Sequence, residues 1–106
     1  MNEQNAVAVK EFDDSFYRVL IAFFREYTGD NLAETMMNPS REHILDSEFK
    51  EIGINSIAFV KMIIALENEF NIEFGDMGLD VENFSSLRQL REYTERMVYE
   101  SRANNG

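Results

Sequence analysis

Ser56 is the residue with the strongest case for chemistry in this sequence. It follows the turn Gly53-Ile54-Asn55 and occupies the first position of a predicted helix that ends near Asn71. A hydroxyl at that position lies beside backbone amides that have no partner in the helix, at the positive end of the helix dipole. An attached phosphate would be stabilised there. Taken alone, the ordinary interpretation is a polar residue that helps to begin a helix, with Asn55 as the cap.

Other catalytic and metal-binding groups are scarce. The chain has no cysteine and a single histidine, His43, which lies in a polar segment. Encoded thiol nucleophiles, disulfides and zinc sites built from cysteines or from two imidazoles are therefore excluded. The acidic residues of 73–82 lack the ligand order of a calcium loop, and the scattered glycines form no phosphate-binding loop. We expect no catalytic residues and no metal site.

The composition indicates one small globular domain. Of the 106 residues 44% are hydrophobic, and the formal charge is -10, which would repel nucleic acids and anionic membrane surfaces. No stretch approaches the roughly 18 uninterrupted apolar residues of a membrane span, and the N-terminus lacks a signal-peptide pattern. We expect a cytoplasmic monomer that binds neither nucleic acid nor membrane.

The apolar periodicity of the N-terminal part predicts a helix from Asp13 to about Tyr27. Asp13 and Asp14 suit its start, and Gly29 can adopt the backbone conformation that closes its end. Residues 30–55 show no sustained period and are predicted to be a long connection with short helical turns. The residues expected to form the buried face of this helix are Phe16, Leu20, Phe23, Phe24 and Tyr27. Those expected to hold the connection on the core are Leu32, Met36, Met37, Ile44, Leu45, Phe49 and Ile52.

The C-terminal part predicts a short third helix and a final helix. Leu79, Val81 and Phe84 would belong to the short helix, which follows Gly75 and Gly78. The final helix, from about 86 to 101, begins with a capping box and carries an apolar face. Ser86 and Gln89 form the box, and Leu87, Leu90, Thr94, Met97 and Val98 form the face.

These elements predict an all-α fold, a four-helix bundle with three longer helices, a short third helix and a long ordered connection between the first two. Residues 13–101 would form the domain, after a flexible N-terminal extension (1–12) and before a frayed tail (102–106).

The helix after Asn55 is apolar almost all round. Val60, Ile63, Ile64 and Phe70 cluster towards one side, and Ala58, Lys61, Ala65 and Asn68 form an outer strip that Ile57 and Ile64 border. This exceeds what the helix needs for its own core. Burial of the surplus against a partner protein would explain it.

Residues 49–74, FKEIGINSIAFVKMIIALENEFNIEF, resemble the acyl and peptidyl carrier protein family around its phosphopantetheine serine. The shared pattern is Leu or Ile, then Gly, two residues, Ser and again Leu or Ile, followed by a helix that closes in an acidic-Phe segment. The resemblance extends more weakly to the flanking helices, including FSSLRQL at 84–90, and covers roughly residues 13–100.

The resemblance implies a carrier that performs no catalysis itself. In this family a phosphopantetheinyl transferase moves 4'-phosphopantetheine from coenzyme A onto the serine that matches Ser56. The thiol of the arm then carries acyl, aminoacyl or growing chains as thioesters between loading enzymes and downstream synthases or transferases. The resemblance also suggests partner-facing positions, at Ile57 and Ile64, and we add the neighbouring Asn55, Ala58 and Lys61 to these candidates.

Two features depart from the family pattern. Asn55 stands where the family most often has Asp, which removes a charge beside the modification site but keeps a cap. The helix after Asn55 also lacks the run of acidic residues that is common in carriers of fatty acid biosynthesis. A free-standing carrier of polyketide or nonribosomal peptide biosynthesis is therefore favoured.

The segment around Gly75 and Gly78 is expected to be a mobile gate that lets the carried chain rest against or between the helices.

Two other interpretations remain. The chain could be a small acidic helical module that binds a partner protein through the helix after Asn55, with Ser56 unmodified. A weak calcium sensor, using Asp76 or Asp80, ranks last.

Overall fold

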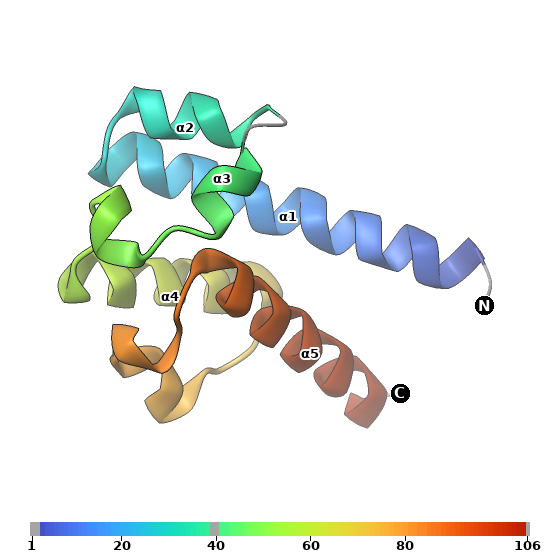
Figure 1. Cartoon of the computed structure of the whole chain (residues 1–106). Coiled ribbons are helices and arrows are strands. Elements are labelled where there is room, and N and C mark those ends of the chain that lie inside the picture. Colours follow the sequence, from blue (N-terminus) through green and yellow to red (C-terminus); the bar gives the residue numbers. More distant parts are fainter. Residues whose placement is uncertain (1–2, 39–40, 106) are drawn as a thin grey trace.

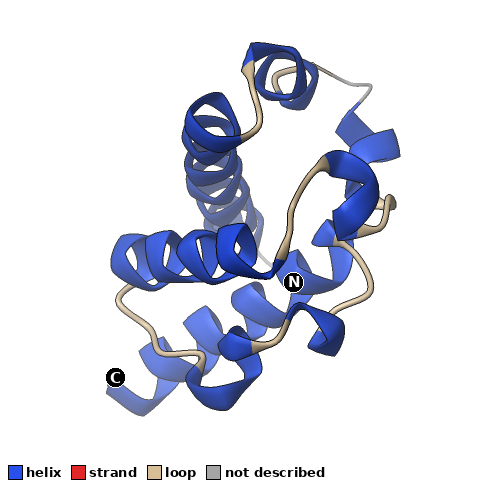
Figure 2. Cartoon of the chain, turned by 90° about the vertical axis from the view of Figure 1, so that its left-hand side faces the viewer, coloured by secondary structure: helices blue, strands red, loops and turns tan. Residues whose placement is uncertain are grey.

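The computed structural model of the chain describes residues 3–38 and 41–105 (Figure 1). These residues contain helices and no β-strand (Figure 2), which confirms the all-α prediction. The α-helices are α1 (Glu3–Tyr27), α2 (Asp30–Met36), α3 (Arg41–Leu45), α4 (Ser56–Phe70) and α5 (Leu87–Asn105). Three short 3-10 helices lie between them, η1 (Phe49–Ile52), η2 (Gly75–Leu79) and η3 (Val81–Asn83).

The long helix α1 packs against α2 on one side and α4 on the other. The end of α1 and the beginnings of α2 and α4 lie at one end of the molecule, with η1 between α2 and α4 (left in Figure 1). The η2 and η3 turns lie on the opposite side of α4 from α2. One hydrophobic core joins the elements, and its fully buried side chains include Phe16, Leu20, Phe24, Met36, Leu45, Phe59, Met62, Leu66, Leu87 and Leu90.

Helix α1 begins ten residues earlier than the sequence predicts. Its first residue is Glu3, so Asp13 and Asp14 lie inside the helix and do not start it. Asp13 has another role, because its carboxylate accepts hydrogen bonds from Arg91 of α5, the closer at 2.7 Å. The predicted end of the helix is confirmed, since α1 stops at Tyr27 and Gly29 follows with φ 118°. The division into extension, domain and tail stays a prediction, and residues 1–2 and 106 lie outside the described residues.

Two residues expected in the core lie largely outside it. Tyr27 is 44% exposed and Met37 60% exposed. Tyr27 is the last residue of α1, and Met37 is the C-cap that follows α2. The other expected residues of α1 are buried. The connection after α1 contains helical turns as predicted, α2, α3 and η1, and its residues 39–40 lie outside the described residues.

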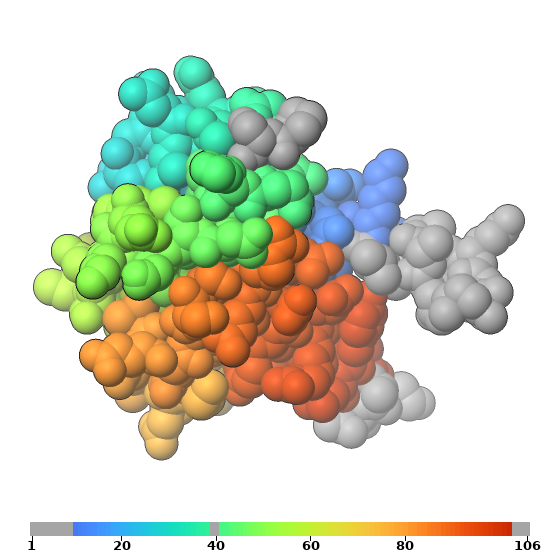
Figure 3. Space-filling model, in the orientation of Figure 1, coloured from blue at the N-terminus to red at the C-terminus, as the bar shows by residue number. Residues whose placement is uncertain are grey.

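Ion pairs attach α5 to the N-terminal half. Arg91 pairs with Asp13 of α1, and Arg88 pairs with Glu42 of α3 and with Asp46 at 2.8 and 2.6 Å. The hydrogen bond from Arg88 lowers the pKa of the exposed Asp46 carboxyl. Figure 3 shows α3 and α5 next to each other on one face of the molecule.

The capping box predicted for the last helix is present in a modified form. Ser86 Oγ accepts from the Gln89 amide at 3.3 Å, and Leu90 N donates to Ser86 O, so Ser86 caps α5. The Gln89 side chain, however, accepts from the amide and hydroxyl of Ser85 and not from Ser86. The Ser86–Gln89 pattern therefore predicted the start of α5 correctly.

The predicted short third helix is two 3-10 turns, η2 and η3, joined at Asp80. Leu79, expected to pack on the bundle, is 66% exposed. Gly78 is buried against α4, and a Cβ at this position would lie 2.6 Å from Ile63 Cγ2 and 2.9 Å from Phe74 Cβ. The role of Gly78 is therefore close packing. The mobile gate at this segment stays a prediction.

We expect Gly78→Ala to destabilise the fold by about 1–3 kcal/mol, because the added methyl group forces Ile63 or η2 to move. Urea unfolding followed by circular dichroism measures this. Asp76→Ala, an exposed change in the same turn, is the control and should stay within about 0.5 kcal/mol of wild type. Equal stability of Gly78→Ala and wild type would contradict the packing described here.

Candidate functional site

The segment before α4 is held by a well-defined turn. In η1, Glu48 and Glu51 form a reciprocal capping box, and Gly53 ends the turn with φ 84°, a left-handed conformation that favours glycine. Ile54 N donates to Phe49 O at 2.9 Å, and the Ile54 side chain is buried. The chain is thus anchored two residues before Ser56.

Asn55 is the N-cap of α4, as the sequence predicts. Its Oδ1 accepts a hydrogen bond from the amide of Ala58 at 2.8 Å, and its carbonyl accepts from Phe59 N at 2.8 Å. Ser56 is then the first residue of the helix, and it is exposed. The anchors at Ile54 and Phe59, both buried, fix the backbone on either side of an accessible hydroxyl.

This arrangement fits a phosphate ester on Ser56. The Ala58 amide is occupied by the cap, whereas the amides of Ser56 and Ile57 precede the first intrahelical hydrogen bond and remain at the positive end of α4. No acidic residue lies in the first turn of α4 to repel a phosphate, since Asn55 is uncharged. The residues present can therefore bear a phosphodiester at the helix start, on an exposed residue.

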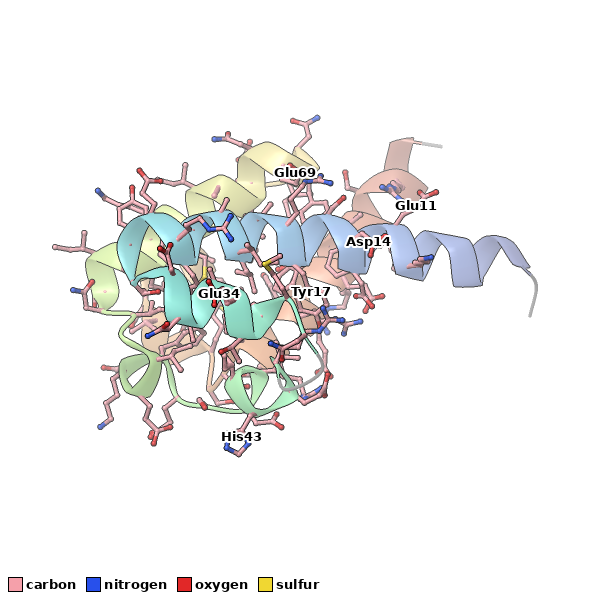
Figure 4. All side chains as sticks on the ribbon, turned by 90° about the horizontal axis from the view of Figure 1, so that it is seen from above. Glu11, Asp14, Tyr17, Glu34, His43 and Glu69 are labelled. Carbon is pink, nitrogen blue, oxygen red and sulfur yellow. The ribbon has the colours of Figure 1, made fainter. Side chains whose placement is uncertain are left out.

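The outer surface of α4 is apolar and carries no free carboxylate. Ile57 is 71% and Ile64 49% exposed, and the exposed Lys61 lies between them on the helix. Both acids of α4 have partners: Glu67 accepts from Phe74 N at 2.8 Å, and Glu69 pairs with Arg18 of α1 at 2.7 Å. Figure 4 shows Glu69 on the α4 side of the contact with α1. We call Ile57, Ala58, Lys61 and Ile64 the α4 face.

A groove of about 450 Å³ lies beside the α4 face, between α1 and α4. Ala22 and Phe23 of α1 and Ile64 and Ala65 of α4 contribute to its lining. Tyr27 closes one part of the groove, and Lys61 Nζ lies 5.1 Å from the centre of its ring. The apolar periodicity predicted Tyr27 to lie in the core and did not predict its position on the lining of this groove. Its place at the last turn of α1, next to Thr28-Gly29, was the available signal that it could lie at the surface.

The remaining titratable groups include one histidine and many carboxylates. The residues that the structure describes contain no cluster of three or more His, Asp or Glu side chains arranged to hold a metal ion. His43 is exposed on α3 and points away from the body of the protein (Figure 4). Among the described helices, none combines the length and the apolar character needed to cross a membrane.

The predicted site residues therefore lie together at the start and along the outside of α4. Asn55, Ser56, Ile57, Lys61 and Ile64 are exposed, and Ala58 is half-buried beneath them.

Comparisons with known proteins match a large part of the chain. Residues 30–94 match the family model described as "Phosphopantetheine attachment site". The chain is 38% identical over 55 residues to "Acyl carrier protein 2" of Pseudomonas aeruginosa. The aligned region covers 51% of this chain and 67% of that protein. It is 32% identical over 65 residues to "Acyl carrier protein" of Cyanidium caldarium, covering 59% of this chain and 73% of that protein. No solved structure gives a significant match.

We expect Asn55→Ala to destabilise the protein by about 1 kcal/mol, because the Ala58 amide loses its acceptor, while Asn55→Asp keeps the cap. Urea unfolding measures both. Asn68→Ala, an exposed asparagine on α4 without a capping role, should change stability by less than about 0.5 kcal/mol. If Asn55→Ala matched Asn68→Ala, the cap would not contribute to stability.

Proposed function

The chain belongs to the phosphopantetheine-binding carrier protein family, and on this premise we propose that Ser56 is the residue that carries the 4'-phosphopantetheine group. Such a carrier is not an enzyme. Its covalent prosthetic group comes from coenzyme A, and when bound it supplies a thiol that holds an acyl or aminoacyl chain as a thioester. The protein itself encodes no thiol, because it has no cysteine.

One observation carries the assignment to Ser56. It is the exposed first residue of α4, inside the matched residues 30–94, with a buried anchor before it and after it. In the attachment reaction the Ser56 oxygen would form a bond to the phosphorus that bears the pantetheine arm of coenzyme A. The bond from that phosphorus to the bridging oxygen of the pyrophosphate breaks, adenosine 3',5'-bisphosphate leaves, and the hydroxyl proton passes to a base of the transferase.

The α4 face is proposed as the docking surface for the transferase and for the loading and downstream enzymes. Its exposed isoleucines would be buried on docking, which removes their contact with water. Asn55 belongs to the same surface, since it is exposed beside Ser56. Both carboxylates of α4 have partners within the chain, which favours partner enzymes that dock through apolar contacts. Such an enzyme would place an acidic group opposite Lys61.

We also propose that the carrier serves a dedicated pathway, such as polyketide or nonribosomal peptide biosynthesis. The support is Asn55 at the start of α4 and the neutral to basic α4 face, neither of which suits partners that select an acidic surface. Efficient use of the modified protein by purified enzymes of general fatty acid elongation would overturn this part of the proposal.

Co-expression with a broad-specificity phosphopantetheinyl transferase tests the attachment site. We expect the intact mass of wild type to increase by one phosphopantetheinyl group and that of Ser56→Ala to remain unchanged. Ser47→Ala is the matched control and should gain one group, because Ser47 lies outside the site and its hydroxyl only donates to His43 O.

Wild-type protein that stays unmodified with several transferases would instead favour an interaction module without a prosthetic group. A gain of mass by Ser56→Ala would place the group on a different residue.

Substitution on the α4 face tests the docking surface. We expect Ile64→Ala to lower kcat/KM for loading by the cognate enzyme about tenfold, equivalent to about 1.4 kcal/mol of lost apolar contact. Met37→Ala removes another exposed apolar side chain, on the end of α2, and should leave loading unchanged. Equal loading of Ile64→Ala and wild type would show that the partner does not bury this residue.

A further inference from the structure

A second groove lies at the end of the molecule where α4 begins. It has a volume of about 540 Å³ and is formed by the end of α1, by α2 and by η1. This volume falls within the range of small-molecule sites, about 300–1,000 Å³. Both polar and apolar side chains line it. The polar ones are Thr28, Asn31, Thr35 and Glu51, and the apolar ones include Leu32 and Ile52.

The groove begins close to Ser56. Gly53, which lines it, precedes Ser56 by three residues, so their Cα atoms are at most about 11 Å apart along the chain. The elements that form the groove lie at the same end of the molecule as the start of α4 (Figure 1). The η2 and η3 turns lie on the other side of α4, so a group on Ser56 has two distinct sides to occupy.

Gly53 lines this groove without contributing a side chain to it. A Cβ at this position would meet a single neighbour, Thr28 Cγ2, at 4.0 Å. A side chain at this position would therefore meet only Thr28, at van der Waals distance, but the left-handed φ of 84° favours glycine here. The turn before Ser56 thus places no side chain at position 53 on the wall of the groove.

The polar groups of the groove are suited to amides. The hydroxyls of Thr28 and Thr35 donate to the carbonyls of Phe24 and Asn31, at 3.1 and 3.0 Å, so their oxygens are left as acceptors. The Asn31 side chain makes no hydrogen bond to any part of the chain that the structure describes, and it offers both a donor and an acceptor. A pantetheine arm contains two amides, a hydroxyl and a pair of methyl groups on one carbon, which need such partners and an apolar contact.

We propose, on the premise that Ser56 carries the arm, that this groove is the resting site of the pantetheine arm when no partner is bound. The arm leaves Ser56 past Gly53 and lies between α2 and η1. Its amides bind Asn31 and the threonine oxygens, and its methyl groups contact Leu32 and Ile52. The thiol end then lies on the α2 side of the molecule and away from η2 and η3.

A spin label on the arm tests this location without any enzyme assay. Because the chain has no cysteine, a maleimide nitroxide reacts with the arm thiol alone. Intact mass first establishes that the arm and the label are present, so failure of the attachment at Ser56 is seen separately. In the labelled protein we expect paramagnetic loss of amide signal to be larger at Thr28, Asn31 and Thr35 than at Glu82 and Asn83 of the η3 turn.

Two α2 variants complete the test. Asn31→Trp fills the groove and should restore the Thr28 and Thr35 signals, whereas Glu34→Trp, an exposed change on the same helix outside the groove, should leave their loss unchanged. Larger loss at Glu82 and Asn83 in the wild type, equal loss on both sides of α4, or equal behaviour of the two variants would overturn the proposal while leaving the attachment at Ser56 intact.

Discussion

The proposed attachment at Ser56 imposes one constraint on the structure: the chain must be held in place on both sides of Ser56 and open at Ser56 itself. Burial of Ile54 and Phe59 provides the rigidity, and the hydrogen bond from Ala58 N to Asn55 Oδ1 fixes where α4 begins. A buried serine could not be reached by a transferase, and a serine in an unanchored loop would not be presented in one geometry. The short cap and its two apolar anchors satisfy both demands within six residues of sequence.

Helix α4 contributes apolar side chains both to the core and to the surface. Its inner side fills the bundle with Phe59, Met62, Ile63 and Leu66, and its outer side leaves Ile57 and Ile64 in water. Exposed apolar side chains of this size bring no stability to the isolated protein, and a partner that covers them gains their burial. Because Glu67 and Glu69 have partners within the chain, Phe74 N and Arg18, the net charge of -10 does not describe the α4 face. The acidity lies elsewhere, and the face next to Ser56 is apolar with one lysine.

Local signals in the sequence predicted the parts of the structure that local chemistry determines. The cap at Asn55, the end of α1 before Gly29 and the start of α5 at Ser86 all follow from residue types that bind their own backbone neighbours. Long-range contacts could not be predicted this way. Asp13 resembles a helix start until Arg91 is found beside it, 78 residues away, and Gly78 resembles a flexible point until Ile63 is found against it. The second groove belongs to the same class, because α2 and η1 form it only after the fold brings them together.

The most direct test of the account is peptide mass spectrometry on the protein taken from the cells that make it. Trypsin cleaves after Lys50 and Lys61, and the peptide between them contains Ser56 as its one hydroxyl-bearing side chain. The account predicts that this peptide carries a phosphopantetheinyl group, with or without an acyl or aminoacyl chain on its thiol. An unmodified 51–61 peptide, or the group on another peptide of the chain, would contradict it.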